Sequence, residues 1–161
     1  MSSEFLVGLD AVDWVSLGYP EMPNWIRNLA SNTPELRAAS YNQIEDLIAN
    51  AGSQSPENYG PISELLKTEM PIYITPFLIE LLDYEKIEDK ASILQLIYDL
   101  ANYQDLVTSI DGEVYKARAK RVFEALRQGE PTYKMLLSDA NASVRNMAKQ
   151  VLSSIGLSNF S

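Results

Sequence analysis

A chain of 161 residues is long enough to bury one ordinary hydrophobic core, and its 46% hydrophobic and 22% charged composition is typical of a globular domain. Neither cysteine nor histidine occurs, which excludes a disulfide framework, a Ser-His-Asp triad and a zinc site of the usual Cys/His kind. The formal net charge of -9 argues against nucleic acid as the partner, because phosphate contacts need clustered Lys and Arg.

The amino-terminal stretch MSSEFLVGLDAVDW lacks a basic region followed by an apolar run, so no signal peptide is expected. No window approaches 18 continuous apolar residues, the minimum for a membrane-spanning helix. These features predict a cytoplasmic protein that does not associate with membranes.

Helical spacing of apolar residues recurs along the chain, whereas alternating β-branched runs bounded by turn signals do not. The first long helix is predicted after Pro34, with Gly52 just beyond its end. A second is predicted to start at Thr75 and Pro76. Further helices are predicted within residues 89–103, 113–128, 131–139 and 142–156. Six to nine helices joined by turns indicate an all-α fold.

Charge is unevenly distributed along the chain and changes sign at the start of the predicted helix at 113–128. Residues 1–113 carry 19 acids against 5 bases, whereas residues 114–161 carry 3 acids against 8 bases. One interpretation is an ordinary solvated basic helix face. The other is that opposite ends of the molecule steer different partners, or different faces of one partner.

An internal repeat relates two segments 108 residues apart. WIRNLASNTPELRAASYNQI aligns without a gap on YKMLLSDANASVRNMAKQVL, which places Trp25 on Tyr133 and Arg37 on Arg145. A looser copy lies between them if Leu82 takes the place of Leu29, and Lys90 then occupies the arginine position. Three helix-turn-helix units are therefore expected, and such units stack because none can bury its apolar face alone.

The third copy, LLSDANASVRNMAKQVL, resembles the HEAT repeat, in which an Asp in the turn precedes Val-Arg at the start of a second helix. LDAVDWVSLGYPEMPNWIRNLASNTPELRAASYNQIEDLI and ITPFLIELLDYEKIEDKASILQLIYDLA are similar to a group of small bacterial HEAT-repeat proteins, many of them uncharacterised. The resemblance implies one domain over 1–161, a short right-handed α-solenoid of about three hairpins plus extra helices. The repeat units would span about 23–50, 74–102 and 131–156, with an inserted helix at 113–128.

The resemblance also assigns roles to individual residues. Four are expected to order the repeats: Arg37, Asp83, Asp139 and Arg145. Exposed second-helix positions and loop tyrosines, a residue type enriched at interfaces, form the candidate protein-binding surface: Gln43, Asp46, Tyr59, Tyr84, Gln95, Asp99, Asn146 and Gln150. The acidic residues of the 83–89 segment are interleaved with Lys86 and lack calcium-loop spacing, so they are interpreted as a solvated loop.

Stacked hairpins present a surface suited to proteins or extended ligands. The leading hypothesis is therefore a non-enzymatic module that binds another protein, with no cofactor and no metal. One form of it is an inhibitory or immunity-like protein whose acidic surface blocks a basic nuclease. The alternative is an accessory factor related to the HEAT-repeat phycobilin lyases, although the chain has no Cys or His to handle a chromophore.

Overall fold

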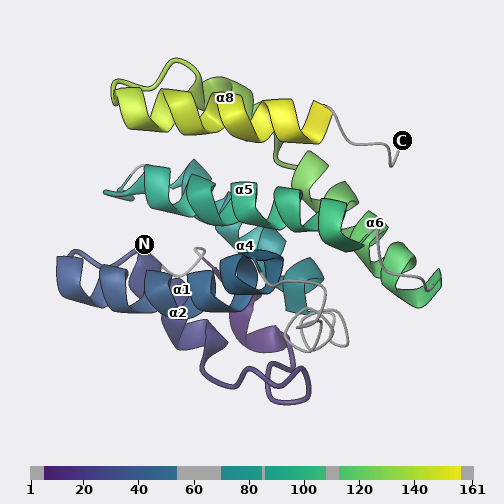
Figure 1. Ribbon diagram of the computed structural model, residues 1–161. Helices are drawn as coiled ribbons and strands as arrows, with labels where there is room; N and C mark the ends of the chain where they lie inside the picture. Colours follow the sequence, from purple (N-terminus) through teal and green to yellow (C-terminus); the bar gives the residue numbers. More distant parts are fainter. Residues whose placement is uncertain (1–5, 54–69, 85, 108–112, 157–161) are drawn as a thin grey trace.

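The computed structural model describes residues 6–53, 70–84, 86–107 and 113–156 (Figure 1). The described residues form seven α-helices and include no strand, which confirms the prediction of an all-α fold. A 3-10 helix, η2 (Leu9–Ala11), comes first, followed by α1 (Met22–Leu29), α2 (Pro34–Ser53), α4 (Met70–Asp83), α5 (Lys90–Val107), α6 (Glu113–Arg127), α7 (Glu130–Leu136) and α8 (Ala142–Gly156).

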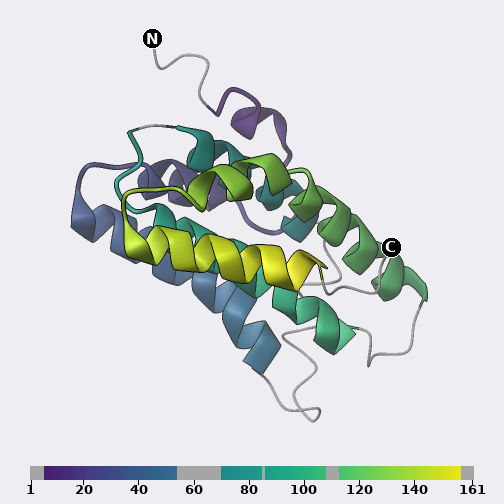
Figure 2. The ribbon, with the colours of Figure 1, turned by 90° about the horizontal axis from the view of Figure 1, so that it is seen from above.

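The helices are arranged in two layers. In one layer α5 lies between α2 and α8 and packs against both (Figures 1 and 2). In the other layer α1 packs on α2, α4 on α5 and α7 on α8, while α6 packs on both α4 and α5. Each helix of the α2, α5 and α8 layer thus packs against the helix that precedes it along the chain.

The central position of α5 explains its composition. Ile93, Leu94, Leu96, Ile97 and Leu100 are all buried, so the apolar surface of this helix extends around more than one face. Burial of each such side chain contributes about 1.5–3 kcal/mol. The hydrophobic core is therefore continuous through α5 from one side of the layer to the other.

The helix α4 starts earlier than the sequence predicts. Thr75 and Pro76 are expected at its beginning, but the helix begins at Met70 and contains Pro76 in its interior. A proline supplies no N–H to the helix, and the hydroxyl of Thr75 donates to the carbonyl oxygen of Pro71 at 2.7 Å. The prediction was wrong because proline is commonest in the first turn of a helix, and here tertiary packing keeps it inside one.

The segment before α1 is anchored on α4. The indole of Trp14 is buried, its Nε1 donates to the carbonyl oxygen of Leu9 at 2.8 Å, and its ring lies 6.1 Å from that of Phe77. The backbone N–H of Leu6 donates to the carboxylate of Glu80 at 2.5 Å. These contacts cover α4 around Phe77 and Glu80.

The buried stripes of α2 and α8 differ although their sequences align. Ser40 and its counterpart Ala148 are both buried, but Leu36 is 47% exposed where Val144 is only 5% exposed. The two helices pack on opposite sides of α5 (Figure 1), so their buried stripes overlap at Ser40 and Ala148 but are rotated relative to each other.

Candidate functional site

Two turns of the molecule share one hydrogen-bond pattern. Nη1 of Arg37 donates to the backbone oxygen of Ser31 at 2.7 Å, and Nη1 of Arg145 donates to the backbone oxygen of Asp139, also at 2.7 Å. The hydroxyl of Ser31 accepts a bond from the backbone N–H of Thr33, as the carboxylate of Asp139 does from Asn141. The turns α1–α2 and α7–α8 therefore share these two hydrogen bonds at positions 108 residues apart.

These contacts define what Asp139 and Arg145 do. The guanidinium of Arg145 bonds the backbone oxygens of Asp139 and Ala140, at 2.7 and 3.0 Å, rather than the Asp139 carboxylate. A carbonyl oxygen held by a charged donor orders the turn that joins two helices. The pair acts in the architecture of the hairpin.

The central turn between α4 and α5 is built differently. Asp89 caps α5, because its two carboxylate oxygens accept bonds from the backbone N–H and the hydroxyl of Ser92, at 3.1 and 2.6 Å. Nη1 of Arg37 reaches across to Oε2 of Glu88 at 3.2 Å, which ties the first turn to the second. Asp83, at the end of α4, accepts a bond of 2.8 Å from the hydroxyl of Thr132 and so ties the second hairpin to α7.

Six residues of the candidate binding surface lie in the layer formed by α2, α5 and α8. Gln43 and Asp46 are exposed on α2, as are Asn146 and Gln150 on α8. Gln95 and Asp99 on α5 are half-buried and bonded to each other, Nε2 to Oδ1, at 3.0 Å. Tyr84 is half-buried and packs on the core from the α4–α5 turn, and Tyr59 lies outside the described residues.

The contact between α2 and α5 gathers acidic side chains that sequence reasoning did not bring together. Burial raises the pKa of the Asp99 carboxyl, the hydrogen bond from Gln95 lowers it, and the charge of Glu45 on α2 raises it. Burial likewise raises the pKa of Tyr41, and its hydrogen bond to Glu45 and the charges of Glu45, Asp99 and Asp89 add to the effect. We call Tyr41, Glu45, Asp89 and Asp99 the acidic seam.

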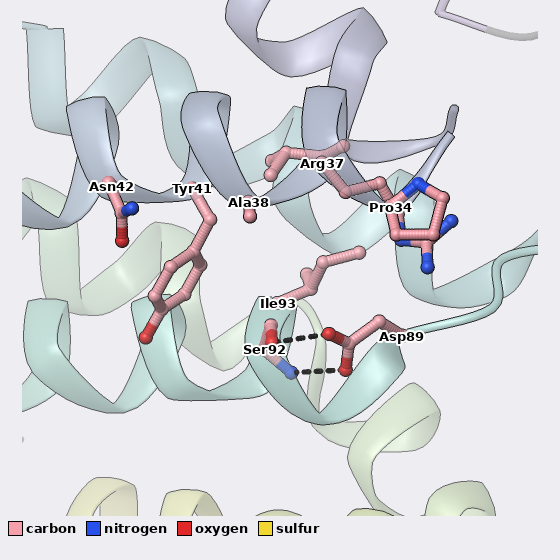
Figure 3. A pocket seen from close by; sticks show the side chains of 9 residues that line it. Pro34, Arg37, Ala38, Tyr41, Asn42, Asp89, Ser92 and Ile93 are labelled. Atoms are coloured by element: carbon pink, nitrogen blue, oxygen red, sulfur yellow. Dashed lines mark hydrogen bonds between the residues drawn. The ribbon is translucent and has the colours of Figure 1, made fainter. Parts of the chain in front are cut away.

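A cavity of about 260 Å³ opens beside the acidic seam, between α2 and the start of α5 (Figure 3). Tyr41 and Asn42 extend from α2 toward α5. On the opposite side, Ser92 lies in the first turn of α5 and Asp89 immediately precedes that helix, with its carboxylate turned toward Ser92. Apolar side chains complete the walls: Leu29, Pro34, Ala38 and Ile93. The cavity combines apolar walls with a polar, acidic rim.

Tyr41 and Glu45 were not among the predicted site residues. Their spacing of four residues places them on one face of α2, a signal that the sequence contains. Which helix this face meets follows only from the packing of α2 on α5, and that pairing brings in Asp89 and Asp99.

The basic part of the chain lies on α6, in the other layer. Lys120, Arg121 and Arg127 are exposed there, and the Arg127 guanidinium lies 5.6 Å from the centre of the Phe123 ring. Phe123 itself is buried, so the helix packs through this ring and turns its cations outward. The exposed cations of α6 thus lie in a different layer from the acidic seam, whereas α8, which carries Arg145 and Lys149, shares the layer of α2 and α5.

Within the described part of the chain, no group of three or more acidic side chains is arranged to hold a metal ion. None of the described helices combines the length and apolar character needed to cross a membrane.

Comparison with protein-family models finds no match, and comparison with curated protein sequences finds none either. The function therefore has to be argued from the geometry of the two layers.

Proposed function

We propose that this chain is a short right-handed α-solenoid of about three HEAT-like hairpins that binds another protein and catalyses no reaction. The repeated turn chemistry at Arg37 and Arg145, together with the side-by-side packing of α2, α5 and α8, supports the architecture. Stacked hairpins offer a surface built from the second helix of each unit, and this layer is the binding face that we propose.

The observation that carries the proposal is the acidic seam in this layer. Glu45 and Asp99 come from two helices, and the charge of Glu45 adds to burial in raising the pKa of Asp99, so this charge disfavours the packing of α2 on α5. Sequences depart from locally favourable choices chiefly at functional sites. A partner that supplies positive charge would relieve the repulsion.

A basic protein is therefore the preferred partner, which is consistent with an inhibitory or immunity-like role in the cytoplasm. Co-expression with the product of a neighbouring toxin gene tests this form of the proposal. Growth is expected to be rescued by the wild type and lost when the acidic seam is neutralised. Failure of the wild type to rescue growth would overturn the inhibitory role against that toxin.

The broader proposal is tested by affinity capture from the native host, with mass spectrometry of retained proteins. Two double variants add positive charge to the proposed face: Gln43→Lys with Asp46→Lys on α2, and Asn146→Lys with Gln150→Lys on α8. The matched control, Glu21→Lys with Asn24→Lys, adds the same charge type at exposed positions at and just before the start of α1.

Proteins retained by the wild type and by the α1 control, but lost from the α2 and α8 variants, are the expected result. Retention of the same proteins by all four forms would show that the α2, α5 and α8 layer is not the binding face. Thermal unfolding of each variant checks that the charge changes have not unfolded the chain.

A further inference from the structure

The cavity between α2 and α5 has the dimensions of a site for a single side chain. Its volume of about 260 Å³ is below the range of roughly 300–1,000 Å³ that is typical of small-molecule pockets. It is partly open to solvent between α2 and the start of α5, and the side chains that line it are labelled in Figure 3. A side chain projecting from a partner's surface can therefore enter it.

The walls of the cavity suit an aliphatic stem. Leu29, Pro34, Ala38 and Ile93 provide carbon surface, and long basic side chains bury their methylene groups against such surface while the charged head stays at a polar rim. A short polar side chain would leave this surface uncovered.

The charges at the rim suit a cationic head group. Asp89 lines the cavity, and the charges of Asp89, Glu45 and Asp99 all act on the Tyr41 ring that forms one wall. Arg37 also lines the cavity, but its guanidinium is bound to Glu88 at 3.2 Å and to the Ser31 backbone oxygen at 2.7 Å. The positive charge of Arg37 is thus compensated by Glu88. The negative charge of Asp89 remains at the rim, and Glu45 and Asp99, which do not line the cavity, add negative charge on the side of Tyr41.

We propose that this cavity receives a lysine or arginine side chain of the protein partner, with its stem against Ala38 and Ile93 and its cation at the rim between Asp89 and Tyr41. This inference rests on the proposed protein-binding function and specifies the chemistry of the partner. An anionic or purely apolar side chain would lie beside the same carboxylates without neutralising their negative charge.

The test uses acetylated and amidated pentapeptides Gly-Gly-X-Gly-Gly, titrated into the full ¹⁵N-labelled chain at low salt and followed by amide chemical shifts. X is lysine, arginine, norleucine or glutamate, so that the stem is kept in norleucine while the charge is removed. The lysine and arginine peptides are expected to shift the amides of Ala38, Asn42 and Ile93 in a saturable way, more strongly than the norleucine peptide and with no comparable effect of glutamate.

Isosteric variants locate the charge that matters. Glu45→Gln and Asp89→Asn each remove one carboxylate of the seam, and asparagine keeps the ability to cap α5. Each substitution is expected to lower the affinity for the lysine peptide about three- to fivefold, which is the effect expected for loss of a partly exposed ion pair. The matched controls Glu124→Gln on α6 and Asp139→Asn in the α7–α8 turn remove the same charge elsewhere and should leave the affinity unchanged.

Equal shifts with the lysine and norleucine peptides, or equal weakening by the seam variants and the controls, would overturn the inference. Its failure is distinguishable from failure of the proposed function. Capture of a partner that depends on Asp46 but not on the seam would retain the binding face and reject the cationic anchor. Selective binding of the lysine peptide with no partner captured would retain the anchor site and reject the protein-binding role.

Discussion

At the scale of single residues, Gly129 is the most closely surrounded of the described glycines. A Cβ atom added there would lie 2.6 Å from Cζ and Oη of Tyr133 and 3.0 Å from Cδ1 of Ile79. Tyr133 is fully buried, and its hydroxyl donates to the Leu126 backbone oxygen at 2.9 Å. The absent side chain of Gly129 is what lets α7 follow α6 so closely.

Gly129→Ala should therefore destabilise the fold by about 1–3 kcal/mol, the usual cost of overpacking a buried site. Gly156→Ala is the control, because nothing lies within 4 Å of its added Cβ, and it should be neutral or slightly stabilising. Urea unfolding of both variants measures the difference. Equal stabilities would show that the α6–α7 junction relaxes freely.

The half-buried carboxyl of Asp99 makes stability depend on pH. Burial raises its folded-state pKa above the unfolded value, so the folded state binds the proton more tightly and the contribution of Asp99 is lost as pH rises through that pKa. Asp99→Asn removes the charge and keeps an oxygen to accept the Gln95 bond.

We expect Asp99→Asn to be more stable than the wild type at pH 7. This gap in the free energy of unfolding should narrow on acidification toward pH 4, because Asp99 of the wild type then gains a proton and loses its charge. Thermal unfolding of both forms across this range measures the gap. A gap that is independent of pH would show that Asp99 ionisation does not oppose folding. Glu45→Gln should reduce the gap, because the charge of Glu45 contributes to the shift.

At the scale of helices and turns, Arg37 and Arg145 hold equivalent carbonyl groups. Arg37→Ala and Arg145→Ala should each lower the free energy of unfolding by about 0.5–1.5 kcal/mol for the lost bonds. The two costs should be similar, because Arg37 also loses the Glu88 ion pair and Arg145 also loses its bond to the Ala140 backbone oxygen. Lys149→Ala, on the exposed face of α8, should change stability by less than about 0.5 kcal/mol.

Amide hydrogen exchange separates the two turns. Arg145→Ala should increase exchange at the start of α8 and leave the start of α2 unchanged, with the reverse for Arg37→Ala. Faster exchange throughout the molecule in either variant would contradict a local turn-ordering role.

The elements differ in how far they could be predicted. The 3.6-residue spacing of apolar side chains identifies α2, α5, α6 and α8, because the apolar face of a helix depends only on residues that are close together in the sequence. The start of α4 is missed because Pro76 is a start signal that tertiary packing overrides. The acidic seam is missed for a different reason: Glu45 and Asp99 are 54 positions apart, and their proximity depends on the pairing of α2 with α5.

At the scale of the whole molecule, the acidic seam and the basic face of α6 lie in different layers. The seam lies between α2 and α5, and the exposed cations Lys120, Arg121 and Arg127 lie on α6. Such an arrangement orients an approaching charged partner. Screening at 0.5 M salt, where the Debye length falls to roughly 4 Å, should therefore weaken capture of a basic partner. Capture that is insensitive to salt would indicate an apolar interface instead.

The central claim is that the α2, α5 and α8 layer binds the partner through the acidic seam. Hydrogen exchange of the chain, free and saturated with the captured partner, tests this most directly. Protection is predicted on α2, α5 and α8, strongest around Tyr41 and Ser92, with α1 and α7 unchanged. Protection confined to α6 or to the α1, α4 and α7 layer would contradict the account.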